Sequence, residues 1–359
     1  MSEQTKILVI PKINHIYLSS LYSKICKNDN FIVYSSDRYN NIIKNIFKTD
    51  IIHLHWIEGL FKGFNNSNNV FFILIKTFIY VNFIIFCKFI LKKKIVITLH
   101  NVISHNNNFP LLEKKIFKFS LKTSDAIIIH NNYSKKKAIE LYELNEKKTH
   151  IIPIGNYSVN GNNNKKFSKS ETRKLLNIPE KKFVVLFFGS IQNYKGISDL
   201  IQVFSKILEY DNDFYLIVAG SCNDKDLKNQ LSNFSKSYEH NCKIFLDYIE
   251  DDLIPVLMNA SNVGILPYKR ISTSAVLLLF MSYSVPIIIS RLEPFEELLG
   301  NNGIYYKVGD NEDLEKKIIY AKNHYSELGN LSRKLLKLSK KYEWGEIADN
   351  TIEIYKMIR

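Results

Sequence analysis

A glycine, a serine and a lysine follow one strand-like segment at the spacing of a phosphate-binding turn. In FVVLFFGSIQNYKGISDLIQVF, Gly189 and Ser190 come directly after an apolar run, and Lys195 and Gly196 open a helical pattern. The free N–H groups and the dipole at a helix N-terminus attract anions, and a lysine adds a mobile positive charge. The segment predicts an anion site, although an ordinary strand-to-helix turn with a solvated lysine would give the same pattern.

Hydroxyl residues repeat this arrangement further along the chain. In NVGILPYKRISTSAVLLLFMSYSVPIIIS, residues 272–274 follow a strand-like run and a basic turn with Lys269 and Arg270, and a helix is expected to begin near Val276. Hydroxyls at a helix N-cap beside exposed N–H groups suit a phosphate, although an ordinary Ser/Thr cap has the same composition. Open α/β sheets bind ligands at the carboxyl ends of their strands. The two turns together predict a nucleotide diphosphate site.

The elements that would carry these turns form two series of short β-branched runs alternating with helix-length segments. This alternation predicts parallel α/β sheets, and hence two doubly wound domains in tandem. The polar, Asn-rich segment YSVNGNNNKKFSKS at 157–170 is interpreted as the linker between them. The first series consists of KILVI, NFIVYS, DIIHLHW, KIVITLH, DAIIIH and HIIPI, and the second of KFVVLFFGS, DFYLIVAGS, KIFLDYI, NVGILPY and VPIIIS.

The composition is that of a folded, basic protein in a reducing compartment. The 359 residues exceed what one core usually organises, and 46% hydrophobic residues with only 13 Gly and 8 Pro exclude a disordered or collagen-like chain. The net charge of +14 favours phosphates, nucleic acid or an anionic membrane surface. Four cysteines without a C-x-x-C and an N-terminal apolar run too short for a signal peptide favour the cytoplasm.

One apolar segment, residues 70–91, is long enough to span a bilayer. However, Lys76, Asn82 and Lys88 recur every six residues, which spreads polar groups over three faces of a helix and places a charge near mid-membrane. The segment also lies where a β-α-β crossover helix belongs. We therefore expect a helix that packs one side on a sheet and dips the other into lipid, with residues 92–94, all lysine, at the headgroups.

Seven segments in order resemble the GT-B nucleotide-sugar glycosyltransferases, specifically glycosyltransferase family 4 and related bacterial enzymes that build surface polysaccharides on lipid carriers. The resemblance implies an acceptor-binding Rossmann-like domain at 1–160, a donor-binding one at 170–340 facing it, and a C-terminal helix at 341–359 that crosses back onto the first. The segments are IIHLHWIE, ITLHNVISHN, SDAIIIHNNYS, HIIPIGNY, GSIQNYKG, ILPYKRISTSAVLLLFMSYSVPIII and YEWGEIADNTIEIY.

The resemblance assigns donor-binding roles in the second domain. Lys195 matches the lysine that contacts the donor diphosphate, next to Gly189 and Ser190, and Tyr248 and Ile249 fall where relatives hold the base. Glu297 matches a glutamate near the donor sugar or ribose. The helix-capping loop presented to the phosphates is matched by Thr273, Ser274 and Ala275.

In the first domain, His100 matches a cleft histidine that touches the transferred sugar in relatives, although a structural histidine at a strand end would look the same. Glu58 or an imidazole of His53 or His55 could serve as general base if the reaction inverts. The acceptor-binding candidates are Asn14, Tyr17, His55 and His105.

Some positions depart from the family pattern. The paired glutamates of many family 4 members are replaced by Ile271 and Leu279, as in the subgroup with a TSG-type loop, and this leaves retention or inversion open. Gln192 stands where a basic residue is common and Ala275 where glycine is usual, so the phosphate site would rely more on Lys195. The loop PKINHIY also lacks the Gly-rich turn of many retaining relatives.

The resemblance implies a metal-independent hexosyltransferase that uses a UDP- or GDP-linked sugar and no cofactor. The acceptor would be a lipid-linked (undecaprenyl diphosphate) saccharide of O-antigen, lipopolysaccharide, capsule or exopolysaccharide synthesis. We expect a cytoplasmic protein, peripheral on the inner face of the cell membrane and held there by anionic lipid. A sugar-nucleotide epimerase on the same fold is the alternative. A nucleic-acid-binding protein ranks last, because the basic residues form no recognition helix or Arg-rich stripe.

Overall fold

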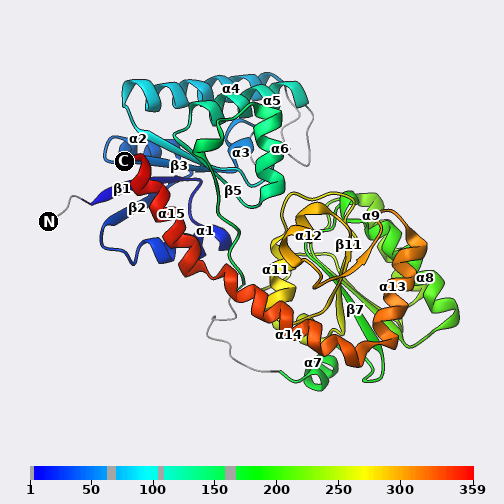
Figure 1. Cartoon of the computed structure of the whole chain (residues 1–359). Helices are drawn as coiled ribbons and strands as arrows, with labels where there is room; N and C mark the ends of the chain where they lie inside the picture. Colours follow the sequence, from blue (N-terminus) through cyan, green and yellow to red (C-terminus); the bar gives the residue numbers. More distant parts are fainter. Residues whose placement is uncertain (1–3, 63–69, 104–108, 158–166) are drawn as a thin grey trace. The chain divides into compact units, whose positions relative to one another are not determined.

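The computed structural model describes residues 4–62, 70–103, 109–157 and 167–359, and it divides into two compact units. The first unit comprises Met1–Gly155 and Tyr342–Arg359, and the second comprises Asn156–Lys341. Each unit is built on one six-stranded, all-parallel sheet (Figure 1). The predicted tandem α/β architecture is confirmed. Residues 158–166 of the predicted linker lie outside the described residues.

The first sheet has the strand order β2-β1-β3-β4-β5-β6. Its strands are the six apolar runs of the first series, and all positions of β3 and β5 are buried, as in a sheet covered on both faces. The bounds are β1 Thr5–Ile10, β2 Phe31–Ser35, β3 Ile51–His55, β4 Lys94–Thr98, β5 Ala126–Ile129 and β6 Thr149–Ile151.

Helices cover both faces of this sheet. One face packs against α2 to α6, whereas the other packs against α1 and the C-terminal helix α15. Trp344 begins α15 and its ring fills the space beside Gly155, where a Cβ would lie 2.4 Å from the indole. The bounds are α1 Ile16–Ile25, α2 Tyr39–Ile46, α3 Ile57–Lys62, α4 Val70–Ile85, η1 Phe86–Ile90, α5 Pro110–Thr123, α6 Asn132–Tyr142, η2 Glu146–Lys148 and α15 Trp344–Ile358.

The predicted helix at 70–91 is α4 continued by the π-helical turn η1. Within the described residues, Val70–Ile90 is the one helix long and apolar enough to cross a membrane, a test that a buried core helix also passes. Its inner side contributes Tyr80, Ile84 and Cys87 to the core, but only 22% of its apolar 18-residue stretch is buried. Lys88 faces the protein, where it pairs with Asp125 at 2.6 Å. The outer side exposes Phe71, Phe72, Leu74, Ile75, Phe78, Ile79, Phe86, Phe89 and Ile90.

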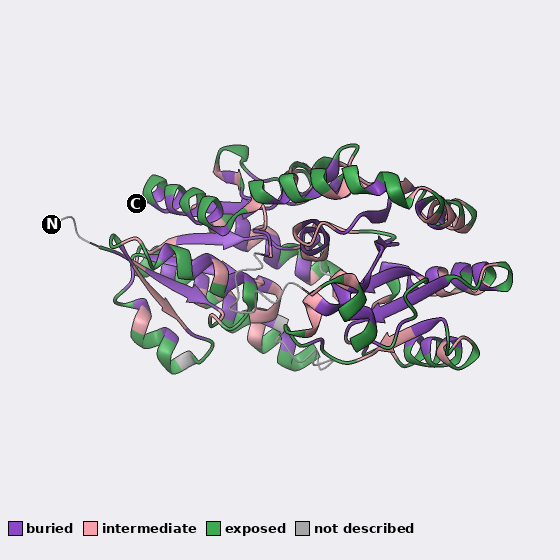
Figure 2. Ribbon diagram, turned by 90° about the horizontal axis from the view of Figure 1, so that it is seen from below, coloured by how far each residue is buried: buried purple, intermediate pink, exposed green. Residues whose placement is uncertain are grey.

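The second sheet has the strand order β12-β11-β10-β7-β8-β9. Five strands are the runs of the second series; the sixth, β12, is only three residues long, too short to show a pattern in the sequence. Most strands of the two sheets are buried and the helices have one exposed side (Figure 2), whereas β2 and β9 are mostly half-buried. The bounds are β7 Phe183–Phe188, β8 Phe214–Ala219, β9 Cys242–Phe245, β10 Val263–Leu266, β11 Ile287–Ser290 and β12 Ile304–Tyr306.

The second unit contains eight helices longer than one turn and three single 3-10 turns in its described part. Helix α7 begins with a capping box between Ser168 and Glu171, which ends the predicted linker earlier than Ser170. The bounds are α7 Lys169–Leu175, η3 Asn193–Lys195, α8 Ile197–Tyr210, α9 Lys225–Ser237, α10 Leu253–Ala260, α11 Ala275–Ser282, α12 Glu293–Leu299, α13 Asn311–Asn323, η4 Tyr325–Glu327, α14 Leu328–Ser339 and η5 Lys340–Tyr342.

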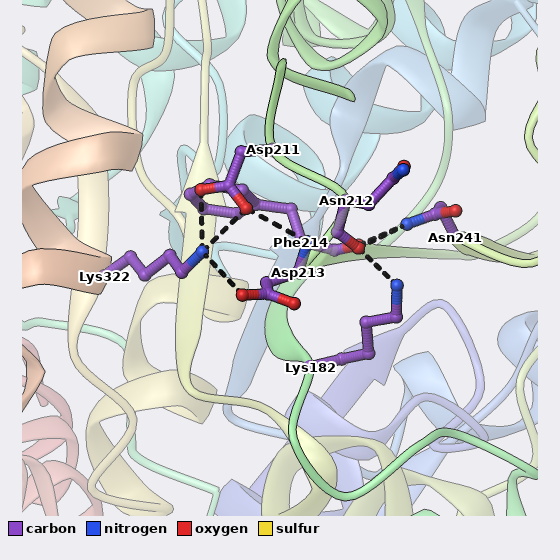
Figure 3. Close-up of polar contacts among 7 residues, drawn as sticks. All are labelled: Lys182, Asp211, Asn212, Asp213, Phe214, Asn241 and Lys322. Carbon is purple, nitrogen blue, oxygen red and sulfur yellow. Dashed lines mark hydrogen bonds and ion pairs between the residues drawn. The ribbon is translucent and has the colours of Figure 1, made fainter. Parts of the chain in front are cut away.

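A cluster of polar side chains connects the segments at the amino end of the second sheet (Figure 3). Lys322 of α13 lies 2.7 Å from a carboxylate oxygen of Asp211 and 3.5 Å from one of Asp213. The carbonyl of Asn212 accepts hydrogen bonds from Lys182 and from Asn241. Because ligands of parallel sheets bind at the opposite, carboxyl edge, this cluster is part of the framework of the fold.

Candidate functional site

The two predicted anion-binding turns follow neighbouring strands of the second sheet. The strand order begins at β7, runs outward to β9, and then restarts on the other side of β7 with β10. Lys195 follows β7 and Ser274 follows β10, so both turns lie at the point where the order reverses. Open α/β sheets bind ligands at such a point, because the two loops leave the sheet in opposite directions.

Lys195 is a buried cation at this switch point. Its side chain is 7% exposed, and its ammonium donates a hydrogen bond to Ser190 Oγ at 3.1 Å and lies 5.4 Å from the centre of the Tyr268 ring. Burial lowers the pKa of Lys195 from 10.5 to about 8. No carboxylate of a described residue forms an ion pair with this ammonium. A buried charge without a counter-ion is costly, so the site is poised to receive an anion.

Glycines bring the backbone close to Lys195. Gly196 has φ of +70° and would place a Cβ 1.9 Å from the carbonyl oxygen of Pro267, so only glycine fits. Gly189 has φ of +106°, and a Cβ there would lie 3.5 Å from Lys195 Nζ. The turn thus depends on glycine to seat the lysine against the end of β7.

The hydroxyl turn caps α11 as the sequence predicted. Ser274 Oγ accepts a hydrogen bond from the N–H of Leu277 at 3.2 Å, while Thr273 and Ala275 are half-buried beside it. Burial raises the pKa of Tyr268, which Ser274 partly offsets, yet no described residue meets the buried Tyr268 hydroxyl in normal hydrogen-bond geometry. A polar ligand atom at the switch point would satisfy the hydrogen-bonding capacity of this hydroxyl.

The basic residues of this turn have other partners. Lys269 Nζ lies 2.9 Å from a carboxylate oxygen of Asp199, and the guanidinium of Arg270 lies 5.9 Å from the centre of the Tyr194 ring. Among these three basic residues, Lys195 is the buried one, whereas Lys269 and Arg270 are exposed.

The remaining predicted donor residues lie on loops and helices that follow strands of the same sheet. Tyr248 is 71% exposed and Ile249 is buried, both between β9 and α10. Glu297 lies on α12, which follows β11, and is exposed. All three are at the carboxyl edge, and their contact with a donor stays a prediction.

In the first unit, histidines at the carboxyl ends of the neighbouring strands β3, β4 and β5 form a hydrogen-bonded chain. Tyr22 OH lies 2.9 Å from His55 Nε2, and His55 Nδ1 lies 3.1 Å from His100 Nε2. The chain continues from His100 Nδ1 to His130 Nε2 at 3.1 Å, and His130 Nδ1 donates to the carbonyl of Ile152 at 2.9 Å. All of these rings are buried.

Burial keeps these histidines neutral. It lowers the pKa of His53 to about 3 and that of His130 to about 4. Burial, together with neighbouring histidines, also lowers the pKa of His55 and of His100 well below the usual value. Since a carbonyl only accepts, the proton of neutral His130 is on Nδ1. His100 and His55 must then carry their protons on Nδ1 as well, and Tyr22 donates to His55.

This chain bears on the predicted role of His100. Both of its ring nitrogens already have histidine partners, and the Trp56 indole stacks on the ring at 4.2 Å between centroids. His100 is 9% exposed. To accept a proton from a substrate, it would first have to give up a hydrogen bond, so its catalytic role stays a prediction.

The structure brings some acceptor-side candidates together. The Tyr17 ring lies 4.9 Å from that of His100 and 5.8 Å from that of His55, edge-on to both. Asn14 is exposed just before α1, and Glu58 is half-buried in the first turn of α3. His105 lies outside the described residues.

The sequence analysis did not identify two members of this cluster, His130 and Trp56. His130 follows β5 as His100 follows β4 and as His55 ends β3, and this repetition at strand ends was the signal that would have identified it. Trp56 has a left-handed φ of 45°, unusual for a residue other than glycine. Within the described residues, no group of three or more His, Cys, Asp or Glu side chains could hold a metal ion.

Comparisons with known proteins also indicate a glycosyltransferase. The family model described as Glycosyl transferases group 1 matches residues 168–338. The chain is 24% identical over 194 residues to an uncharacterized glycosyltransferase of Methanocaldococcus jannaschii, covering 53% of this chain and 48% of that protein. It is also 24% identical over 264 residues to the alpha-monoglucosyldiacylglycerol synthase of Acholeplasma laidlawii, covering 66% and 63%. The chain thus spans about half to two thirds of these relatives' length.

A solved structure resembles the whole chain. The Anabaena protein HepE, in complex with UDP-glucose, aligns with a TM-score of 0.76 at 15% identity, covering 99% of this chain and 100% of that one. At this identity the likeness concerns the fold, and the predicted GT-B fold is confirmed, whereas membership of family 4 stays a prediction. The model of the group 1 family of glycosyl transferases thus matches residues 168–338, within a chain that has the GT-B fold.

Proposed function

We propose that this protein is a hexosyltransferase that moves a sugar from a nucleotide diphosphate donor to a hydroxyl of a lipid-linked saccharide. The transfer would belong to the synthesis of a bacterial surface polysaccharide such as O-antigen, capsule or exopolysaccharide. The second unit would bind the donor and the first unit the acceptor. We expect the protein to work without a bound metal or cofactor.

The observation that carries the proposal is the buried ammonium of Lys195 at the switch point of the second sheet. It lies beside the capped N-terminus of α11, where N–H groups and the helix dipole favour negative charge. A diphosphate placed there would supply the counter-ion that no described carboxylate provides for Lys195, and it would accept hydrogen bonds from Ser190 and Tyr268.

The relatives support the donor and, more distantly, the acceptor. HepE was solved with UDP-glucose, which is a nucleotide diphosphate hexose. The name of the Acholeplasma laidlawii relative describes a synthase of a glucosylated diacylglycerol, and thus a lipid product. An acceptor with a lipid anchor also agrees with the exposed apolar side of α4.

The same helix supports a peripheral position on the inner face of the cell membrane. Its outer side exposes large apolar residues along its length, whereas soluble surfaces rarely expose so large a patch. The chain is basic overall, and each lysine near an anionic surface contributes about 1 kcal/mol.

The proposal is tested by ligand-induced thermal stabilisation with UDP, GDP, CMP and their sugars. A donor present at about 100 times its Kd stabilises the protein by about 2.7 kcal/mol, whereas non-binding nucleotides leave the midpoint unchanged. The nucleotide that binds is then assayed with a radiolabelled sugar and a membrane lipid extract, and radioactivity should move into the lipid fraction.

Two outcomes would contradict the proposal. Conversion of the free nucleotide sugar to an epimer without transfer would favour the epimerase alternative. Stabilisation by DNA oligonucleotides and by no nucleotide would favour a nucleic-acid-binding protein. An exposed lysine, Lys228, gives the control variant Lys228→Met, which should bind the donor as the natural protein does.

A further inference from the structure

The first unit contains an apolar cavity of about 520 Å³. This volume is within the range of about 300–1,000 Å³ that holds small-molecule ligands. Its walls come from α2, α3, α4 and η1, and they are almost entirely aliphatic or aromatic, including Ile42, Ile46, Leu60, Phe83 and Phe86. A cavity of this composition favours a ligand that is itself a hydrocarbon.

The cavity lies at the switch point of the first sheet. The order β2-β1-β3 reverses between β1 and β3. Ile10 and Pro11 at the end of β1 line the cavity from one side of this point, and Gly59 and Leu60, which follow β3, line it from the other. This is the place where open α/β sheets bind ligands, yet Asn14, Tyr17 and His55, the predicted acceptor residues that the structure describes, do not line it.

The cavity is continuous with the exposed apolar side of α4. Ile79 and Phe86 line the cavity and are also 46% and 40% exposed, so they belong to both surfaces. A chain that leaves a lipid layer along this side of α4 therefore reaches the carboxyl end of β1 along a mostly apolar surface.

One wall of the cavity carries a positively charged side chain. Lys76 of α4 is half-buried and lines the cavity. Among the described lining residues it is the one basic side chain, and Asp37 is the one acidic side chain. A lysine beside a hydrocarbon site complements the phosphate that joins a lipid chain to a sugar. An uncharged lipid would gain nothing from it.

We propose that this cavity binds the hydrocarbon chain of the phosphate-linked lipid that carries the acceptor saccharide. The inference rests on the proposed function for the identity of the lipid, and on the cavity and its lining for the place. The chain of an ordinary membrane phospholipid is the competing occupant, and the experiment separates the two.

The test is photolabelling of the full chain with a farnesyl diphosphate analogue that carries a diazirine on its last isoprene unit. Label mapped by mass spectrometry should fall on cavity-lining residues of α2 and α4. Unlabelled farnesyl diphosphate should compete for this labelling better than vesicles of phosphatidylglycerol. Stronger competition by the vesicles would overturn the assignment to the acceptor lipid.

Two residues of η1 supply a matched pair of variants. Phe86 lines the cavity whereas Phe89 does not, and both are exposed at the surface of the same turn. Phe86→Glu should reduce labelling at least about tenfold, because a carboxylate in an apolar site loses its hydration. Phe89→Glu should change labelling less than about twofold. Equal effects of the two variants, or label confined to Phe71 and Phe78, would overturn the proposal.

A second pair of variants, on α4, controls for a folding defect. Ile79 lines the cavity and Ile75, one helical turn earlier on α4, does not, at 46% and 40% exposure. Ile79→Glu should reduce labelling as Phe86→Glu does, and Ile75→Glu should not. An unchanged thermal midpoint shows that a variant is folded.

Failure of this inference is distinguishable from failure of the proposed function. If sugar transfer to a lipid acceptor is equally fast in Phe86→Glu and Phe89→Glu, the cavity assignment fails and the glycosyltransferase stands. If labelling follows the cavity residues but no nucleotide sugar binds, the hydrocarbon site stands and the proposed function fails.

Discussion

Replacing Lys195 with methionine should stabilise the unliganded protein while it weakens donor binding. Burial lowers the pKa of Lys195 from 10.5 to about 8, and a difference of one in pKa corresponds to about 1.4 kcal/mol. The charged ammonium therefore costs the folded state about 3 kcal/mol. Methionine has a similar length and no charge, and loss of the hydrogen bond to Ser190 offsets about 1 kcal/mol. We expect the free energy of unfolding of the second unit to rise by about 2 kcal/mol at pH 7.

The sign of the pH dependence follows from the direction of this shift. Between pH 8 and 10.5 the unfolded lysine binds more protons than the folded one, so its contribution to stability becomes more favourable as pH rises. Below pH 8 both states are charged and the full cost is present. The stabilisation by Lys195→Met should therefore be largest near pH 7 and decline above pH 8.

Donor binding should change in the opposite direction. A hydrogen bond to a charged group contributes about 1.5–3 kcal/mol, so the Kd for UDP should rise about 10- to 100-fold in Lys195→Met. In the natural protein, affinity should fall above pH 8 as the free ammonium loses its proton. Isothermal titration calorimetry measures both effects.

The stability measurement can be confined to the second unit. Both tryptophans, Trp56 and Trp344, are in the first unit, so a urea titration followed by tryptophan fluorescence should be the same in the variant and the natural protein. Hydrogen exchange of the β7 and β8 amides reports unfolding of the second unit and should slow in the variant. Lys228→Met is the control for both readouts. A variant that is less stable in the second unit and binds UDP normally would refute the anion-site reasoning.

Three further predictions concern residues that are buried within the two units. Between pH 7.5 and 5, His130 should cost the first unit about 2 kcal/mol, because the unfolded histidine gains a proton that the folded one, with a pKa of about 4, does not; His130→Gln should remove this loss in urea titrations, and the exposed His240→Gln should not. Gly196→Ala should lower the free energy of unfolding by more than about 2 kcal/mol, since its Cβ would lie 1.9 Å from the carbonyl oxygen of Pro267 in a left-handed conformation. Trp344→Ala should cost about 3–5 kcal/mol in a thermal or denaturant scan, and a change under 1 kcal/mol would contradict its packing role.

The strands were predictable because their information is local. Each apolar run is a few residues long, and burial on both faces gives it a continuous hydrophobic sequence such as FVVLFF. The short strand β12 and the capping box that starts α7 were missed, because three residues show no period and the cap falls within a polar stretch.

The turn between β7 and α8 could also be predicted from the sequence. Glycine before and after a lysine, between a strand and a helix, indicates a tight turn with exposed N–H groups whatever surrounds it. The sequence could not distinguish a solvated lysine from a buried one, since burial depends on Tyr268 and the turn after β10, more than 70 residues later.

The amino-acid sequence by itself determined the alternation of strands and helices, the parallel sheets, and the residue types at the strand ends. Only the tertiary structure decided which strand ends are neighbours. It joined His55, His100 and His130 into one chain, buried Lys195, and opened an apolar cavity between the segments that follow β1 and β3. The physical reason is that periodicity reports which side of each element is buried, whereas strand order depends on contacts between residues far apart in the chain.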